Sequence, residues 1–190
     1  MSDKLNGNLF ERLAAAGKSS TLLLAALTLI LFIVLGVTDE PLKTSASPNG
    51  IVSFELAGNF ANAQSILNSW NNRAKMYAAF SLGIDFLFLF AYSFLFAIVI
   101  AKLSVALKNR FGENLVFRIG IILTALQFFA AFFDTAENIC LINLLFGSLI
   151  SAFANAAFYF AFLKFAFIVA GISYIVFATA KLIVTKTNNR

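Results

Sequence analysis

Residues 118–146, RIGIILTALQFFAAFFDTAENICLINLLF, decide the fold. The stretch is long enough to cross a bilayer as a helix, because a transmembrane helix needs about 20 mostly apolar residues. It nevertheless carries Asp134, Glu137 and Asn138 in its second half. A charged residue at the centre of a span costs about 2.5–3.5 kcal/mol on insertion scales, so such residues usually face a protein interior. The stretch therefore predicts a membrane-spanning helix with one polar inner face.

The rest of the chain has the same apolar character. Of its 190 residues, 61% are hydrophobic and 12% are charged, whereas a soluble domain carries about twice that charged fraction. One cysteine, Cys140, and no histidine exclude an intramolecular disulfide, a histidine-based metal site and a Ser-His triad within the chain. We predict an integral membrane protein with no metal, no cofactor and no nucleic-acid partner. The lipid bilayer is its first partner.

Four apolar runs predict four spans within a single membrane domain, at 21–37, 76–102, 119–146 and 152–180. The remaining segments are a basic N-terminus, a long outer segment, a basic loop, a short outer link and a tail, at 1–20, 38–75, 103–118, 147–151 and 181–190. The first run also fits the apolar part of a signal peptide. We favour an uncleaved span, because the run is long and Leu35-Gly36-Val37 lacks a cleavage-site pattern.

The distribution of basic residues predicts the orientation. Most of the 14 Lys and Arg lie in the N-terminus, the central loop and the tail, namely Lys4, Arg12, Lys18, Lys102, Lys108, Arg110, Arg118, Lys181, Lys186 and Arg190. Short basic segments stay on the cytoplasmic side of a membrane. We therefore expect both termini in the cytoplasm, the plasma (inner) membrane as the location, and an all-α, antiparallel four-helix transmembrane bundle.

The outer segment allows two interpretations. Leu56, Phe60, Ala63, Leu67 and Trp70 follow one another at helical spacing and predict an amphipathic helix. Ile51 to Phe54 fit a short strand equally well, in which case Gly58 separates it from a helix that begins near Asn59, a favourable N-cap. Either arrangement offers an apolar face that lies on the membrane surface or caps the bundle.

Helical spacing brings the polar residues of three spans together. On the third span, one stripe of small or polar residues contains Gly120, Thr124, Gln127, Ala131, Asp134 and Asn138, with Glu137 at its edge. Ser81, Asp85 and Tyr92 share a face of the second span, and Lys164 lies near the middle of the fourth. With both termini inside, Asp85, Asp134, Glu137, Asn138 and Lys164 all fall between the bilayer midplane and the outer surface. The candidate site residues are Asp85, Asp134, Glu137, Asn138 and Lys164, supported by Tyr92 and Gln127.

Charge counting leaves the role of this acidic cluster open. Lys164 neutralises one carboxylate, so the others hold protons, are solvated, or bind a cation or amine. A structural Lys–Asp pair is one interpretation. A second is a ligand-binding or accessory module that engages a small molecule, a lipid, a cation or another membrane protein. The third is a cation- or proton-coupled transport element that acts as a homo-oligomer. The fourth is an intramembrane acid–base enzyme on a lipid-like substrate.

Overall fold

The computed structural model describes residues 9–187, and the regular secondary structure in this part of the chain is helical, with no strands. A short helix, α1 (Leu9–Ala14), precedes α2 (Lys18–Asp39), which continues into the 3₁₀ turn η2 (Glu40–Leu42). Two short helices follow, α3 (Ile51–Glu55) and α4 (Phe60–Ser69). Three long helices complete the fold, α5 (Asn72–Phe111), α6 (Leu115–Leu145) and α7 (Ala152–Thr187). The predicted basic N-terminus, 1–20, and the predicted tail, 181–190, lie partly outside the described residues.

Within residues 9–187, four helices are long and apolar enough to cross a membrane: Lys18–Leu42, Asn72–Phe111, Leu115–Leu145 and Ala152–Thr185. They contain the predicted spans 21–37, 76–102 and 152–180, and the third helix ends one residue before the predicted end of 119–146. α5, with 40 residues, is about 60 Å long at 1.5 Å per residue, well beyond the roughly 30 Å of a hydrocarbon core. Its polar ends therefore continue as helix past the apolar run.

Asparagine side chains set the start of three helices. Asn59, Asn71 and Asn114 each accept a hydrogen bond from the backbone N–H three residues later, at 2.9, 2.9 and 3.2 Å. This interaction satisfies one of the four N–H groups that a helix start leaves without a partner. The predicted N-cap at Asn59 is confirmed. The alternative of a strand over Ile51 to Phe54 is wrong, because these residues form α3.

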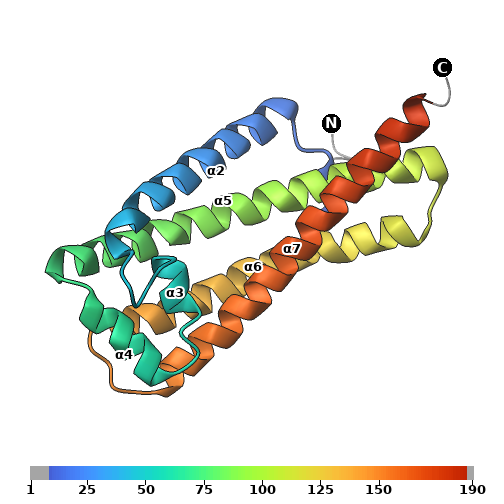
Figure 1. The fold of residues 1–190 in the computed structure, drawn as a ribbon. Helices are drawn as coiled ribbons and strands as arrows, with labels where there is room; N and C mark the ends of the chain where they lie inside the picture. The colour runs from blue at the N-terminus through green and yellow to red at the C-terminus, as the bar shows by residue number, and fades with distance from the viewer. Residues whose placement is uncertain (1–8, 188–190) are drawn as a thin grey trace.

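α5 is the helix on which the other spans assemble. It packs against α2, α6 and α7, and α6 packs along α7. α2 lies along α5 and makes no extensive contact with α7 (Figure 1). The predicted stripe on the third span faces inward, since Gly120, Thr124, Gln127, Asp134 and Asn138 are buried, whereas Phe129 and Phe132 are exposed.

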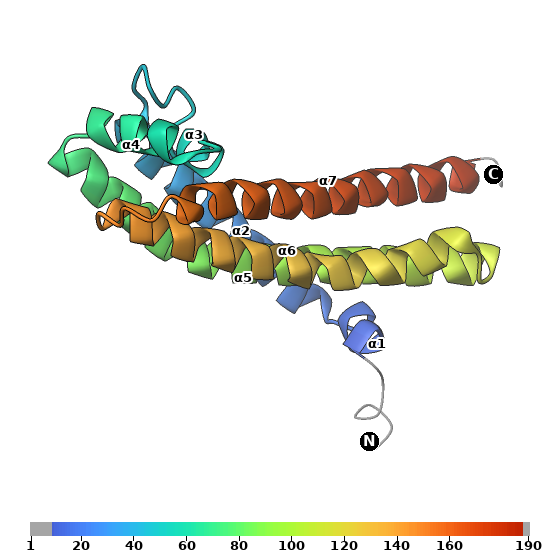
Figure 2. The same cartoon turned by 90° about the horizontal axis from the view of Figure 1, so that it is seen from below.

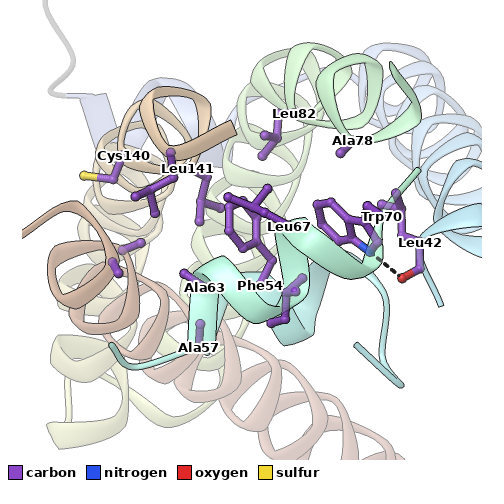
Figure 3. Close-up of a cluster of buried hydrophobic side chains, with 14 of the residues drawn as sticks. Leu42, Phe54, Ala57, Ala63, Leu67, Trp70, Ala78, Leu82, Cys140 and Leu141 are labelled. Atoms are coloured by element: carbon purple, nitrogen blue, oxygen red, sulfur yellow. Dashed lines mark hydrogen bonds between the residues drawn. The ribbon is translucent and has the colours of Figure 1, made fainter. Parts of the chain in front are cut away.

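α3 and α4 form a cap across one end of the bundle, and α1 and the C-terminal part of α7 lie toward the other end (Figure 2). Trp70 anchors the cap. Its indole Nε1 donates to the Leu42 carbonyl at 2.9 Å, and its ring packs edge-on against Phe54. Figure 3 shows this apolar cluster, in which the cap meets Leu82 of α5 and Leu141 of α6. Burying this apolar surface fixes the cap on the spans.

Candidate functional site

Lys164 of α7 lies at the centre of a buried ionic cluster. Its Nζ is 2.8 Å from Glu137 Oε2, 3.0 Å from Asp134 Oδ1 and 3.4 Å from Glu55 Oε2. Lys164 is 5% exposed, Asp134 3%, Glu137 0% and Glu55 8%. The three carboxyls come from α6 and α3, so one ammonium joins the cap to two spans.

Two further contacts extend the cluster to α5. The Tyr92 hydroxyl donates to Asp134 Oδ2 at 2.9 Å, so both oxygens of Asp134 have partners. The Asn138 amide donates to Asp85 Oδ2 at 2.6 Å. Asp85 is half-buried, and within the described part of the chain its Oδ1 accepts no hydrogen bond and no Lys or Arg pairs with it. The structure thus brings Asp85, Asp134, Glu137, Asn138, Lys164 and Tyr92 together.

Glu55 is a member of the cluster that the sequence reasoning missed. It is the only charged residue between Lys43 and Arg73, and an isolated acid after the apolar run Ile51 to Phe54 is the signal that points to it. Burial raises the pKa of the Glu55 carboxyl above its ordinary value, although the attraction of Lys164 opposes this shift. Glu55 Oε2 has no hydrogen-bond partner.

The end of α2 holds α3 in position. Asp39 Oδ1 accepts a hydrogen bond from the Ile51 N–H at 2.7 Å, where α3 begins. Gly50 precedes it with a φ of +55°, and a Cβ there would lie 2.1 Å from Asp39 Oδ1. Only glycine combines this backbone conformation with so close an approach. One turn later, Glu55 therefore points into the bundle toward Lys164.

A cavity of about 280 Å³ opens onto this cluster. Its polar end is formed by Glu55, Asp85, Tyr92, Asp134, Asn138 and Lys164. Its walls are mainly apolar side chains of α2, α3, α5 and α7, including Phe32, Leu35, Phe88, Phe165 and Ile168. On α2, Phe32 and Gly36 line the cavity and are also exposed, so the cavity opens to the surface beside that helix.

The charges in the cluster do not balance. Three carboxyls, those of Glu55, Asp134 and Glu137, lie within 3.4 Å of one ammonium, and a fourth, that of Asp85, lines the same cavity. Glu137 is fully buried; its Oε2 pairs with Lys164 Nζ at 2.8 Å, but among the described residues its Oε1 has no hydrogen-bond partner. An uncompensated buried charge is strongly unfavourable. The cluster must therefore hold protons, or receive positive charge or hydrogen-bond donors from the cavity.

Gln127 lies apart from the cluster. Its Nε2 donates to the backbone carbonyls of Phe167 at 3.2 Å and Leu123 at 3.3 Å, and it does not line the cavity. Its contact with α7 is close, since a Cβ on Gly171 would lie 2.5 Å from Gln127 Nε2. Among residues 9–187, Cys140 is a free, buried thiol, and no group of His, Cys, Asp or Glu has an arrangement that holds a metal ion.

Comparisons with protein-family models, with curated proteins and with solved structures return no match, so the geometry of the site carries the functional argument.

Proposed function

We propose that this chain is a ligand-binding membrane protein whose cavity beside Lys164 takes a small amphiphilic molecule. One observation carries the proposal: apolar walls and an unbalanced acidic cluster meet in the same cavity. Ligand sites are typically apolar with a few polar groups that fix the orientation of the ligand. A purely structural cluster consists of one Lys–Asp pair and other acids that are neutral and hydrogen-bonded, whereas Glu55 Oε2 and Glu137 Oε1 have no hydrogen-bond partner among the described residues.

The same proposal includes a topology. Both termini lie in the cytoplasm, the spans run antiparallel in the plasma (inner) membrane, and α3 and α4 face the outside. The basic segments support this orientation. The position of the cap at the end away from α1 and the end of α7 agrees with it (Figure 2). In this topology Glu55 reaches the cluster from the outer surface, and the cavity lies in the outer half of the membrane.

A second candidate function is proton or cation coupling. The specific observation that favours it is Glu137, a fully buried carboxyl whose Oε1 has no hydrogen-bond partner among the described residues. Intramembrane acids are frequently proton relays. Four spans are few for a transporter, so this function requires a homo-oligomer. The accessory-subunit and acid–base enzyme interpretations stay predictions that no contact here tests.

Native mass spectrometry of the protein, extracted in mild detergent from its own host, tests the proposed function. We expect a bound small molecule on the wild type that is lost in Asp85→Asn, because this change removes a carboxylate that lines the cavity and has no cationic partner among the described residues. Glu113→Gln is the matched control, since Glu113 is an exposed acid paired with Lys108 outside the cavity. A bare wild-type protein, or equal occupancy in both variants, would contradict the proposal.

A further inference from the structure

We infer that the cavity selects a cationic amphiphile, an organic amine with an apolar tail, over neutral and anionic amphiphiles. This inference rests on the proposed function and names its ligand class. The first observation is the state of Asp85. Its Oδ2 accepts from Asn138 at 2.6 Å, while within the described residues its Oδ1 accepts no hydrogen bond, and Asp85 lines the cavity. An ammonium group supplies the missing donor and the missing charge together.

Lys164 is not available to an anionic ligand. Its Nζ already has Asp134, Glu137 and Glu55 within 3.4 Å. Any incoming carboxylate or phosphate would add a negative charge to four acids that share this single ammonium. Like charges at such distances in a buried site repel strongly. A cation instead reduces the excess of negative charge, and Glu55 Oε2, buried at the cavity wall without a hydrogen-bond partner, offers a second acceptor.

The apolar lining of the cavity favours an organic cation over a metal ion. Phe32, Leu35, Phe88, Phe165 and Ile168 surround the space in front of Asp85, and a bare metal ion would leave this apolar surface unused. An alkyl or aryl tail on the ligand covers this apolar surface and removes it from contact with water or lipid headgroups. The ring of Phe88 also attracts a cation within about 6 Å of it, whereas Phe165 already has Lys164 Nζ 5.0 Å from its ring centre.

The opening beside α2 gives the ligand a route from the membrane. α2 makes no extensive contact with α7, and the cavity residues Phe32 and Gly36 are exposed on α2. In the proposed topology this surface faces the lipid of the outer leaflet. A cavity of about 280 Å³ is at the small end of ligand sites, so it takes the headgroup and the first part of a tail, whose remainder lies in the lipid.

Equilibrium binding to the full-length protein in lipid nanodiscs tests the inference, with radiolabelled dodecylamine, dodecanol and dodecanoate as probes and empty nanodiscs as background. We expect saturable dodecylamine binding at least about tenfold tighter than dodecanol binding, the effect of one charge-assisted hydrogen bond, and no saturable dodecanoate binding. Asp85→Asn should remove the preference for the amine. Gly36→Trp, which fills the opening from α2 without touching the acids, should weaken all binding.

The remaining outcomes distinguish failure of the amine preference from failure of the proposed ligand site. Tighter binding of dodecanol or dodecanoate, blocked by Gly36→Trp, would overturn the amine preference and leave the proposed ligand site standing. No saturable binding of any probe, or binding that Gly36→Trp does not change, would overturn both. If Asp85→Asn fails to fold, the wild-type order of the three probes and the Gly36→Trp variant still decide the question.

Discussion

Lys164 is the residue at which the cap and two spans meet, and its removal should expose the excess of negative charge. In Lys164→Met, Asp134, Glu137 and Glu55 lose their shared ammonium. Breaking a buried ion pair by removing one partner costs about 3–5 kcal/mol. We expect a large loss of thermal stability at pH 8, measured as the unfolding midpoint in detergent.

The matched control for Lys164→Met carries Asp134→Asn and Glu137→Gln in addition. Two of the three acids that pair with Lys164 are then uncharged, and only Glu55 remains. Replacing a buried ion cluster by uncharged groups is often close to neutral for stability, so the triple variant should recover much of the loss. A single variant as stable as the wild type would show that the acids are already protonated and that Lys164 compensates no charge.

Glu55 should make stability depend on pH. Burial raises the pKa of the Glu55 carboxyl in the folded protein above its value in the unfolded protein. At a pH between these two pKa values, the folded protein keeps the proton on Glu55 and the unfolded protein has lost it. Stability then falls as pH rises through this window. Glu55→Gln should match the wild type below about pH 4 and fall less between pH 5 and 8. Parallel midpoint curves for the two proteins across this range would contradict the raised pKa.

The close approach of α6 to α5 and α7 depends on Gly120. A Cβ there would lie 1.9 Å from Ser104 Oγ and 2.4 Å from the Tyr174 hydroxyl, which are themselves hydrogen-bonded at 2.8 Å. Gly120→Ala should therefore destabilise the protein by about 1–3 kcal/mol, the usual cost of overpacking. The midpoint of thermal unfolding measures this loss.

Gly83→Ala is the matched control for Gly120→Ala. Gly83 also lies within a span-length helix, but nothing lies within 4 Å of a Cβ built on it. Alanine is the better helix former by up to about 1 kcal/mol, so this variant should be as stable as the wild type or slightly more stable. An equal effect of the two substitutions would refute the packing argument.

The sequence predicted the inward stripe of α6 because lipid-facing and protein-facing positions differ in size and polarity along one helix. Gln127, Asp134 and Asn138 could be assigned to the interior on that basis. α3 was ambiguous because five residues contain too little periodicity to separate a strand from a helix. Glu55 was missed because its partner Lys164 is far along the chain, and local spacing cannot reveal a contact made by a cap that folds back onto the bundle.

Helix ends differ from the predicted spans for a physical reason. Hydropathy marks where apolar residues stop, whereas backbone hydrogen bonds continue into water-exposed turns. The predicted span 76–102 lies within α5, which begins after the N-cap Asn71 and ends before Gly112 at a φ of +72°. Asn71 and Gly112 mark the ends of the helix, whereas hydropathy marks only the ends of its apolar part.

The orientation of the whole molecule can be measured by cysteine labelling. In a Cys140→Ala background, Ser45→Cys and Asn109→Cys place one exposed thiol on the loop before α3 and near the end of α5, respectively. The proposed topology predicts that a membrane-impermeant maleimide added to intact cells labels position 45 only. Permeabilised cells provide the control, since both positions should then react. Labelling of 109 alone in intact cells would reverse the topology and place the cavity in the inner half.

The most direct test of the ligand site is photo-crosslinking from the wall of the cavity. In one variant a benzophenone amino acid replaces Phe165, which lines the cavity. In the control variant it replaces Phe162, which is exposed on the same helix and does not line the cavity. After irradiation of the host's membranes, mass spectrometry should find one dominant small-molecule adduct at position 165 that disappears with Asp85→Asn, and only bulk phospholipid at position 162. The same phospholipid profile at both positions, unchanged by Asp85→Asn, would show that the cavity binds no specific ligand.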